Sequence, residues 1–161
     1  MLAAIAAVDE VLGLGCNGEL QFHIRDDLKR FQSFTLEHTV IYGRKTLATF
    51  PGGRPLAGRR NIILSTRTDL AVEGAEIVHS VQEALSLCTG DAFVIGGASV
   101  YRQFLPYVDA LYLTRVLAHA PHDAVFPPFD EDFFLAETGE ERLDEKTGLR
   151  YRFVEYRRKK E

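Results

Sequence analysis

The stretch Ala92-Phe-Val-Ile-Gly-Gly-Ala-Ser-Val-Tyr-Arg-Gln-Phe-Leu105 decides the fold class. Its first four residues form a short apolar run, and Ser99–Leu105 has the residue spacing of a helix. Only glycines and one alanine separate the two patterns, so a strand ends and a helix begins within a few residues. A strand that leads directly into a helix is the building unit of α/β proteins, and the sequence therefore predicts that class.

Four more apolar runs rich in valine and isoleucine extend the pattern. With the first run they predict strands over Leu2–Val8, Thr39–Tyr42, Asn61–Ser65, Glu76–Val78 and Ala92–Ile95. Such runs do not alternate with polar residues, which is typical of parallel strands covered on both faces. Helical patterns over Asp26–Thr35 and Val81–Cys88 lie between them.

The last third of the chain has a different pattern. Ala110–Val116, Phe133–Thr138 and Tyr151–Arg157 resemble strands without intervening helices, and the last two flank a hairpin-type turn at Asp144–Gly148. We therefore predict one domain over residues 1–161. Its central sheet is mostly parallel with an antiparallel C-terminal strand, and helices cover both faces.

Composition and charge narrow the function classes. A net charge of −4 and a pI of about 5.7 disfavour nucleic-acid binding, because an acidic surface repels phosphate. The only cysteines are Cys16 and Cys88, and without a CxxC motif or a paired histidine cluster they predict neither a disulfide framework nor a metal site. The apolar start ends at Asp9, too early for a membrane span. We therefore expect a cytoplasmic protein without a membrane partner.

The segment Gly13-Leu-Gly-Cys-Asn-Gly18 matches the dinucleotide-binding pattern G-x-G-x-x-G. That motif requires its third glycine to lie inside a helix that begins at the turn. The following residues, 19–24, alternate in character and show no helical face. We therefore predict a flexible glycine-rich loop of the kind that gates active sites, and not a Rossmann site.

The predicted helix Asp26–Thr35 carries two acids at its start. Asp26 suits the N-cap or the first turn, where the helix dipole favours a carboxylate. Asp27 lies four residues before Phe31 and so shares its inward side. The apolar stripe consists of Leu28, Phe31 and Phe34, and the solvent side of Lys29, Arg30, Gln32 and Ser33. Two interpretations of Asp27 stay open: a second capping acid, or an acid that meets N–H donors of a ligand in an apolar pocket.

The chain resembles dihydrofolate reductases over nearly its whole length. Residues 20–31 are similar to the family motif L-P-W-x-L-P-x-D-L-x-x-F, residues 40–46 to V-I-M-G-R-x-T, residues 53–61 to G-R-P-L-P-G-R-x-N, and residues 94–101 to V-I-G-G-x-x-V/I-Y. Phe126-Pro127 falls where the family has its F-P pair. Each motif alone is not specific to the family. Together, the motifs occur in the order and spacing of the family, and this makes the resemblance specific.

The resemblance implies an NADPH-dependent reduction of dihydrofolate by a monomer. Asp27 would hold the pterin, Thr114 would hydrogen-bond this acid, and Arg59 would pair with the glutamate α-carboxylate. Residues at the chemical step would be Leu20, Phe22, Asp27 and Tyr101. The substrate pocket would comprise Ile5, Ala7, Asp27, Leu28, Phe31, Phe50, Leu56, Arg59, Ile95 and Thr114.

For the cofactor, the resemblance implies two glycine turns, each of which ends a strand and opens a helix. Backbone N–H groups at such turns favour a pyrophosphate. The cofactor residues would be Ala7, Leu14, Gly43, Arg44, Lys45, Thr46, Ser65, Thr66, Arg67, Gly96, Gly97, Ala98, Ser99, Val100 and Tyr101. Of these, Arg44, Ser65, Thr66 and Arg67 would meet the 2′-phosphate that distinguishes NADPH from NADH.

Four positions depart from the family pattern. Phe22 replaces a tryptophan whose indole N–H helps to hold a water near the acid, and phenylalanine donates nothing. Gln21 and Arg25 stand in place of prolines, and Ser99 stands where some members use an arginine on the 2′-phosphate. Two alternatives remain. One is a related pyrimidine reductase of riboflavin synthesis, against which Asp27 and Arg59 argue; the other is a protein that binds NADPH or folate without turnover, which Phe22 keeps open.

Overall fold

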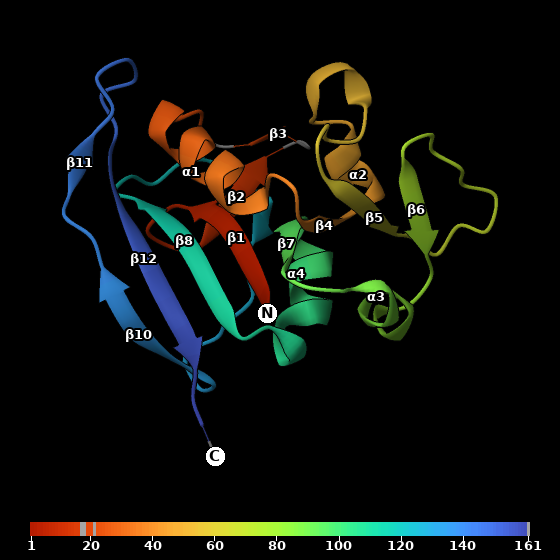
Figure 1. The fold of residues 1–161 in the computed structure, drawn as a ribbon. Helices are drawn as coiled ribbons and strands as arrows, with labels where there is room; N and C mark the ends of the chain where they lie inside the picture. Colours follow the sequence, from red (N-terminus) through yellow and green to blue (C-terminus); the bar gives the residue numbers. More distant parts are fainter. Residues whose placement is uncertain (17–18, 21, 161) are drawn as a thin grey trace.

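The structure, a computed structural model, describes residues 1–16, 19–20 and 22–160. Its main sheet has the strand order β10-β12-β8-β1-β7-β4-β5-β6, with β11 paired to β12 (Figure 1). In chain order these strands are β1 (Leu2–Val8), β4 (Thr39–Gly43), β5 (Arg60–Leu64), β6 (Ala75–Val78), β7 (Ala92–Gly96), β8 (Ala110–Val116), β10 (Phe133–Thr138), β11 (Arg142–Leu143) and β12 (Arg150–Arg158). From β8 to β6 every neighbouring pair is parallel.

The C-terminal edge of the sheet is antiparallel, as predicted. β12 pairs with β8 on one side and with β10 and β11 on the other. The predicted turn at Asp144–Gly148 joins β11 to β12, and it is closed by a bond from the Gly148 N–H to the Asp144 carbonyl (2.7 Å). The short strand β11 was missed, so β10 is not the direct partner across this turn.

Helices cover both faces of the sheet, because side chains of each strand alternate between two apolar layers. On one face lie α1 (Arg25–Thr35) and α2 (Arg44–Leu47); on the other lie α3 (Val81–Leu87) and α4 (Ala98–Phe104) (Figure 1). In β1, Ala3 and Ile5 face α1, whereas Ala4, Ala6 and Val8 pack in the layer of α3 and α4. Short 3-10 helices occupy Pro51–Gly53 and Leu105–Tyr107. No helix in the described part of the chain is long and apolar enough to cross a membrane.

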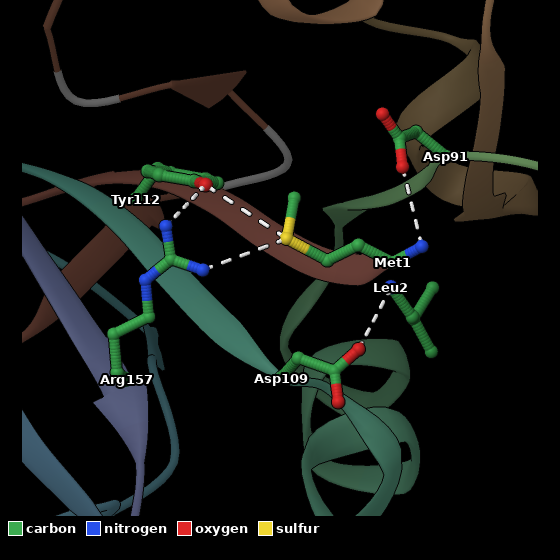
Figure 2. A network of polar contacts seen from close by, with 6 residues as sticks. All are labelled: Met1, Leu2, Asp91, Asp109, Tyr112 and Arg157. Atoms are coloured by element: carbon green, nitrogen blue, oxygen red, sulfur yellow. Dashed lines mark hydrogen bonds and ion pairs between the residues drawn. The ribbon is translucent and has the colours of Figure 1, made fainter.

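The first residues of the chain are held by acids at the start of both neighbouring strands (Figure 2). The Met1 ammonium pairs with Asp91, just before β7 (3.2 Å), and the Leu2 N–H donates to Asp109, just before β8 (3.1 Å). Arg157 of β12 donates to the Met1 sulfur (3.7 Å) and to the Tyr112 hydroxyl (3.3 Å). These contacts fix the start of β1 within the sheet.

The predicted glycine-rich loop is wrong over its first four residues, because Gly13–Cys16 form strand β2. This strand pairs antiparallel with β3 (Glu19–Leu20) and with β9 (Ala124–Val125). A Cβ atom at Gly13 would lie 2.8 Å from side chains of Asp9 and His122, so glycine there permits a close approach and does not supply flexibility. Asn17, Gly18 and Gln21 lie outside the described residues. Because a strand and not a helix follows β2, the Rossmann interpretation is excluded, as expected.

Candidate active site

Asp27 lies in the first turn of α1 and faces the sheet. Its carboxylate accepts a hydrogen bond from the Thr114 hydroxyl of β8, and the Thr114 side chain is buried. Burial raises the pKa of Asp27 above its ordinary value, while the Thr114 hydrogen bond and the charge of Arg30 oppose that rise. The hydrogen-bond partner of Asp27 thus lies on strand β8 and is not a backbone N–H group of α1. The helix-capping interpretation of Asp27 is therefore wrong.

Asp26 stands in the first turn and not at the N-cap, which is Ile24. Its carboxylate accepts a hydrogen bond from the Tyr151 hydroxyl of β12 (3.1 Å). The two adjacent acids thus have different surroundings, and only Asp27 turns toward the apolar layer beneath α1.

Arg30 was predicted on the solvent side of α1, and this is wrong. Its guanidinium lies 4.4 Å from the ring centroid of Phe153 and 5.3 Å from that of Phe34, and it donates to the Leu113 carbonyl (3.4 Å). A long arginine stem can run along apolar surface, so the helical pattern carried no sign of this position. The result is a half-buried cation that lies beside Asp27 and over the rings of Phe34, Phe153 and Tyr112.

The predicted apolar pocket residues come together from four parts of the chain. Phe31 of α1 packs with Ile5 of β1 and Ile95 of β7, and Ile95 also joins the cluster that contains Phe50 and Leu56. Ala7 is half-buried at the end of β1. Leu28 is 58% exposed, so its place in the packed stripe with Phe31 and Phe34 is wrong. The apolar contacts of this helix with the sheet cluster are made by Phe31 and Phe34, and Leu28 lies outside them.

Arg59 lies between the start of β5 and α1. It donates to the Gln32 amide oxygen (2.7 Å), the Thr35 hydroxyl (3.0 Å) and the Ala57 carbonyl (3.0 Å). Gln32 and Thr35 were not predicted as site residues, yet they orient the guanidinium. Arg59 also lines an open groove of about 560 Å³ whose other walls are residues 37–39, 58, 60 and 89–91.

The two predicted glycine turns end neighbouring parallel strands, β4 and β7. A Cβ atom at Gly96 would lie 2.9 Å from the Thr46 hydroxyl, so only a residue without a side chain fits there. Behind this turn, the buried Tyr101 of α4 donates to the Ile5 carbonyl of β1 (2.6 Å). Burial, and to a smaller extent the charge of Asp27, raises the pKa of Tyr101 and keeps its hydroxyl protonated.

The other predicted cofactor residues lie around these turns with varied exposure. Arg44, Lys45, Thr66, Arg67 and Ser99 are exposed, Leu14, Ser65, Gly97 and Ala98 are half-buried, and Val100 is buried. The Arg67 side chain already pairs with Asp69 (3.2 Å). The Ser99 hydroxyl accepts a hydrogen bond from Gln103 (3.1 Å).

Two of the residues that depart from the family pattern, Phe22 and Arg25, lie just before and at the start of α1. Phe22 is half-buried and packs with Ile24, Val116 and Tyr151. Leu20 belongs to β3, and its side chain lies outside the described part of the structure. An apolar cluster, and not a hydrogen-bond donor, therefore occupies the position before α1.

Comparison with known proteins agrees with this geometry. Residues 1–158 match the family model for dihydrofolate reductase. The chain is 36% identical to a dihydrofolate reductase of Bacillus subtilis, with 99% of this chain and 95% of that protein covered. It is 40% identical to one of Neisseria meningitidis, with 98% of each covered. The solved structure of Enterococcus faecalis dihydrofolate reductase complexed with NADP(H) and RAB-propyl superposes with a TM-score of 0.92 at 34% identity, over 99% of this chain and 97% of that one.

Proposed function

The chain belongs to the dihydrofolate reductase family, and on this premise we propose that it reduces 7,8-dihydrofolate to 5,6,7,8-tetrahydrofolate with NADPH, for use in one-carbon metabolism. In this reaction C6 of the pterin receives a hydride and N5 receives a proton. The observation that carries the proposal is Asp27, a largely buried carboxylate held by Thr114 at the edge of an apolar cluster. Such an acid needs a ligand with N–H donors to offset its desolvation.

Asp27 acts by orienting the substrate. Its carboxylate accepts hydrogen bonds from the 2-amino group and the ring N3 side of the pterin, while Thr114 fixes the carboxylate from behind. Burial raises the pKa of Asp27, and donors from a bound pterin act in the opposite direction. The acid thereby favours the protonated substrate, and a water molecule delivers the proton to N5.

The rest of the substrate contacts the clusters that meet at Ile95. The pterin and benzoyl rings pack on Ile5, Ala7, Leu28, Phe31, Phe50, Leu56 and Ile95. Arg59 binds the glutamate α-carboxylate, since a planar guanidinium matches that group. Three hydrogen bonds to Gln32, Thr35 and Ala57 hold this guanidinium in place before the substrate arrives.

The residues at the ends of β4 and β7 fit a dinucleotide. Gly43 and Gly96 end neighbouring strands, and the space that a Cβ atom would fill at Gly96 is bounded by Thr46. The reduced nicotinamide supplies the hydride. Arg44, Ser65, Thr66 and Arg67 would contact the 2′-phosphate. Because Arg67 is paired with Asp69, the exposed Arg44 supplies most of the charge that selects NADPH over NADH.

We also infer that one domain and one copy of the chain suffice, in the cytoplasm. The sheet with its two helical layers spans residues 2–158, which supports a single domain. The Cys88 thiol is free, which suits a reducing compartment.

Absorbance at 340 nm tests the proposed reaction. Purified protein should oxidise NADPH rapidly only when dihydrofolate is present, and NADH should be used more slowly. Turnover of the riboflavin pyrimidine intermediate with no turnover of dihydrofolate would replace the proposed substrate. Binding of NADPH without oxidation by any of these substrates would contradict the proposed activity.

A further inference from the structure

Two histidines and a buried aspartate meet beside the turn between β1 and β2. Asp9 follows β1 and has no exposed surface, whereas His119 and His122 lie between β8 and β9. One potential ligand atom from each of these side chains lies within 4.8 Å of the other two. The expectation that the chain has no paired histidine cluster is therefore wrong, because the rings of His119 and His122 are 6.1 Å apart.

The Asp9 carboxylate is oriented by the turn that follows it. Its Oδ1 atom accepts hydrogen bonds from the N–H groups of Val11 (2.9 Å) and Gly13 (2.8 Å). Its Oδ2 atom lies 3.7 Å from Nδ1 of His122. The Oδ1 atom is therefore fixed by the backbone of the turn, whereas the Oδ2 atom faces His122 and also accepts a hydrogen bond from the Ala120 N–H (3.4 Å). Metal sites commonly hold a ligating carboxylate by this kind of outer hydrogen bonding.

The backbone around the cluster keeps space for the ligand atoms. A Cβ atom at Gly13 would lie 2.8 Å from both Asp9 Oδ2 and His122 Nδ1. Any side chain there would thus occupy the point at which these two atoms approach each other. The His122 Nδ1 atom also lies 3.1 Å from the Ala120 carbonyl, and a metal bound through Nδ1 would replace this contact.

We propose that Asp9, His119 and His122 form a binding site for a divalent transition metal, with Zn²⁺ as the best match. Two imidazole nitrogens and one carboxylate oxygen are a donor set that zinc accepts, with water in the fourth position. Bond lengths of about 2.1 Å in a tetrahedron place ligand atoms roughly 3.4 Å apart, so the side chains must close by on the order of 1 Å. His119 is exposed and His122 half-buried, so both rings can rotate toward Asp9.

A metal at this position joins two segments that already exchange backbone hydrogen bonds. Glu10 N–H donates to the Ala118 carbonyl (3.2 Å), and Asp123 N–H donates to the Gly15 carbonyl (2.9 Å). The site would therefore fasten β2 to the β8–β9 connection, next to the segment that leads to Phe22. Binding to the folded chain alone raises its stability as the free metal concentration rises. The proposal does not depend on the reductase activity.

Calorimetric titration of the untagged full chain with ZnCl₂, in a buffer that does not bind zinc, tests the site. His119→Gln and His122→Gln each remove one ligand from exposed or half-buried positions, so these variants should fold. His38→Gln is the matched control, because His38 is an exposed histidine outside the cluster. Far-ultraviolet circular dichroism verifies folding, and a thermal melt with and without Zn²⁺ gives a second readout.

The expected result is one Zn²⁺ per chain, with affinity at least tenfold weaker in both ligand variants and unchanged in His38→Gln. The rise in Tm on addition of Zn²⁺ should disappear in the same two variants. Equal zinc affinity in all four proteins would overturn the proposal and would indicate binding through thiols or other groups. Absence of zinc binding to the parent chain would overturn it as well.

Discussion

Arg59→Met separates the recognition of the substrate tail from the chemistry at the pterin. Methionine keeps an apolar stem of similar length but removes the guanidinium. The structure commits three N–H groups of Arg59 to Gln32, Thr35 and Ala57. The two N–H groups on the remaining terminal nitrogen have no hydrogen-bond partner among the described residues, and they would donate to the glutamate α-carboxylate.

The size of the effect follows from this arrangement. A hydrogen bond to a charged group contributes about 1.5–3 kcal/mol net, and the half-buried position of Arg59 favours the lower figure. Two such bonds sum to about 3 kcal/mol, and since 1.4 kcal/mol corresponds to a factor of ten, KM for dihydrofolate should rise roughly 100-fold. The tail contact is the same in ground and transition states, so kcat should stay nearly constant.

Dihydropteroate, which lacks the glutamate, provides the decisive comparison. With this substrate Arg59→Met should behave like the parent chain, because the contact that it removes is absent in both. Arg59→Lys should recover part of the affinity for dihydrofolate through its charge, without the planar fork. Arg60→Met is the matched control: the Arg60 guanidinium is held by Glu76 and the Leu87 carbonyl, so KM should not change.

The variant should also fold normally. The Thr35 hydroxyl keeps its bond to the Phe31 carbonyl (2.8 Å), and the Gln32 amide can turn to water. An equal rise in KM for dihydrofolate and dihydropteroate would refute the reasoning, because it would locate the loss in the pocket and not in the tail contact.

Changes at three other positions test Asp27 and its surroundings. Asp27→Asn should lower kcat/KM at neutral pH by roughly 100-fold or more, with partial recovery in acid, and a pH–rate profile equal to that of the parent would contradict the role of the acid. The same variant should be more stable than the parent at neutral pH in urea titrations. Burial raises the folded pKa of Asp27, so its contribution to stability is present below the unfolded pKa and is lost as pH rises through the folded pKa; the difference should vanish in acid. Arg30→Met should raise the pKa of Asp27 further, as followed by carbon-13 NMR, whereas Arg30→Lys should raise it less. Phe22→Trp restores an N–H donor and should increase the rate of the proton-dependent step several-fold; an unchanged pH–rate profile would show that the indole has no part in proton delivery.

The fold could be predicted from the sequence because its elements depend on local patterns. The strand runs at Leu2–Val8, Ala110–Val116 and Phe133–Thr138 match the structure at both ends, and the other predicted strands and helices differ by at most one residue at each end. The motifs around Asp27, Arg59 and the Gly96 turn likewise lie within short segments, so both the family and these candidate residues were accessible from sequence. The acid at position 27 was visible as a charge on an apolar helix face.

The tertiary structure decided what each of these residues contacts. The hydrogen bond from Thr114, on a distant strand, distinguishes between the two interpretations of Asp27. Arg30 is not on the solvent side because its guanidinium packs on aromatic rings of β12 and α1. The glycine segment became β2 because β9 supplied a pairing edge. Asp9 lies close to His119 and His122 because β1 and β8, which precede these residues, pair in the sheet. Local sequence sets which backbone conformation a segment prefers, but contacts between distant segments depend on chain topology, and no local pattern encodes them.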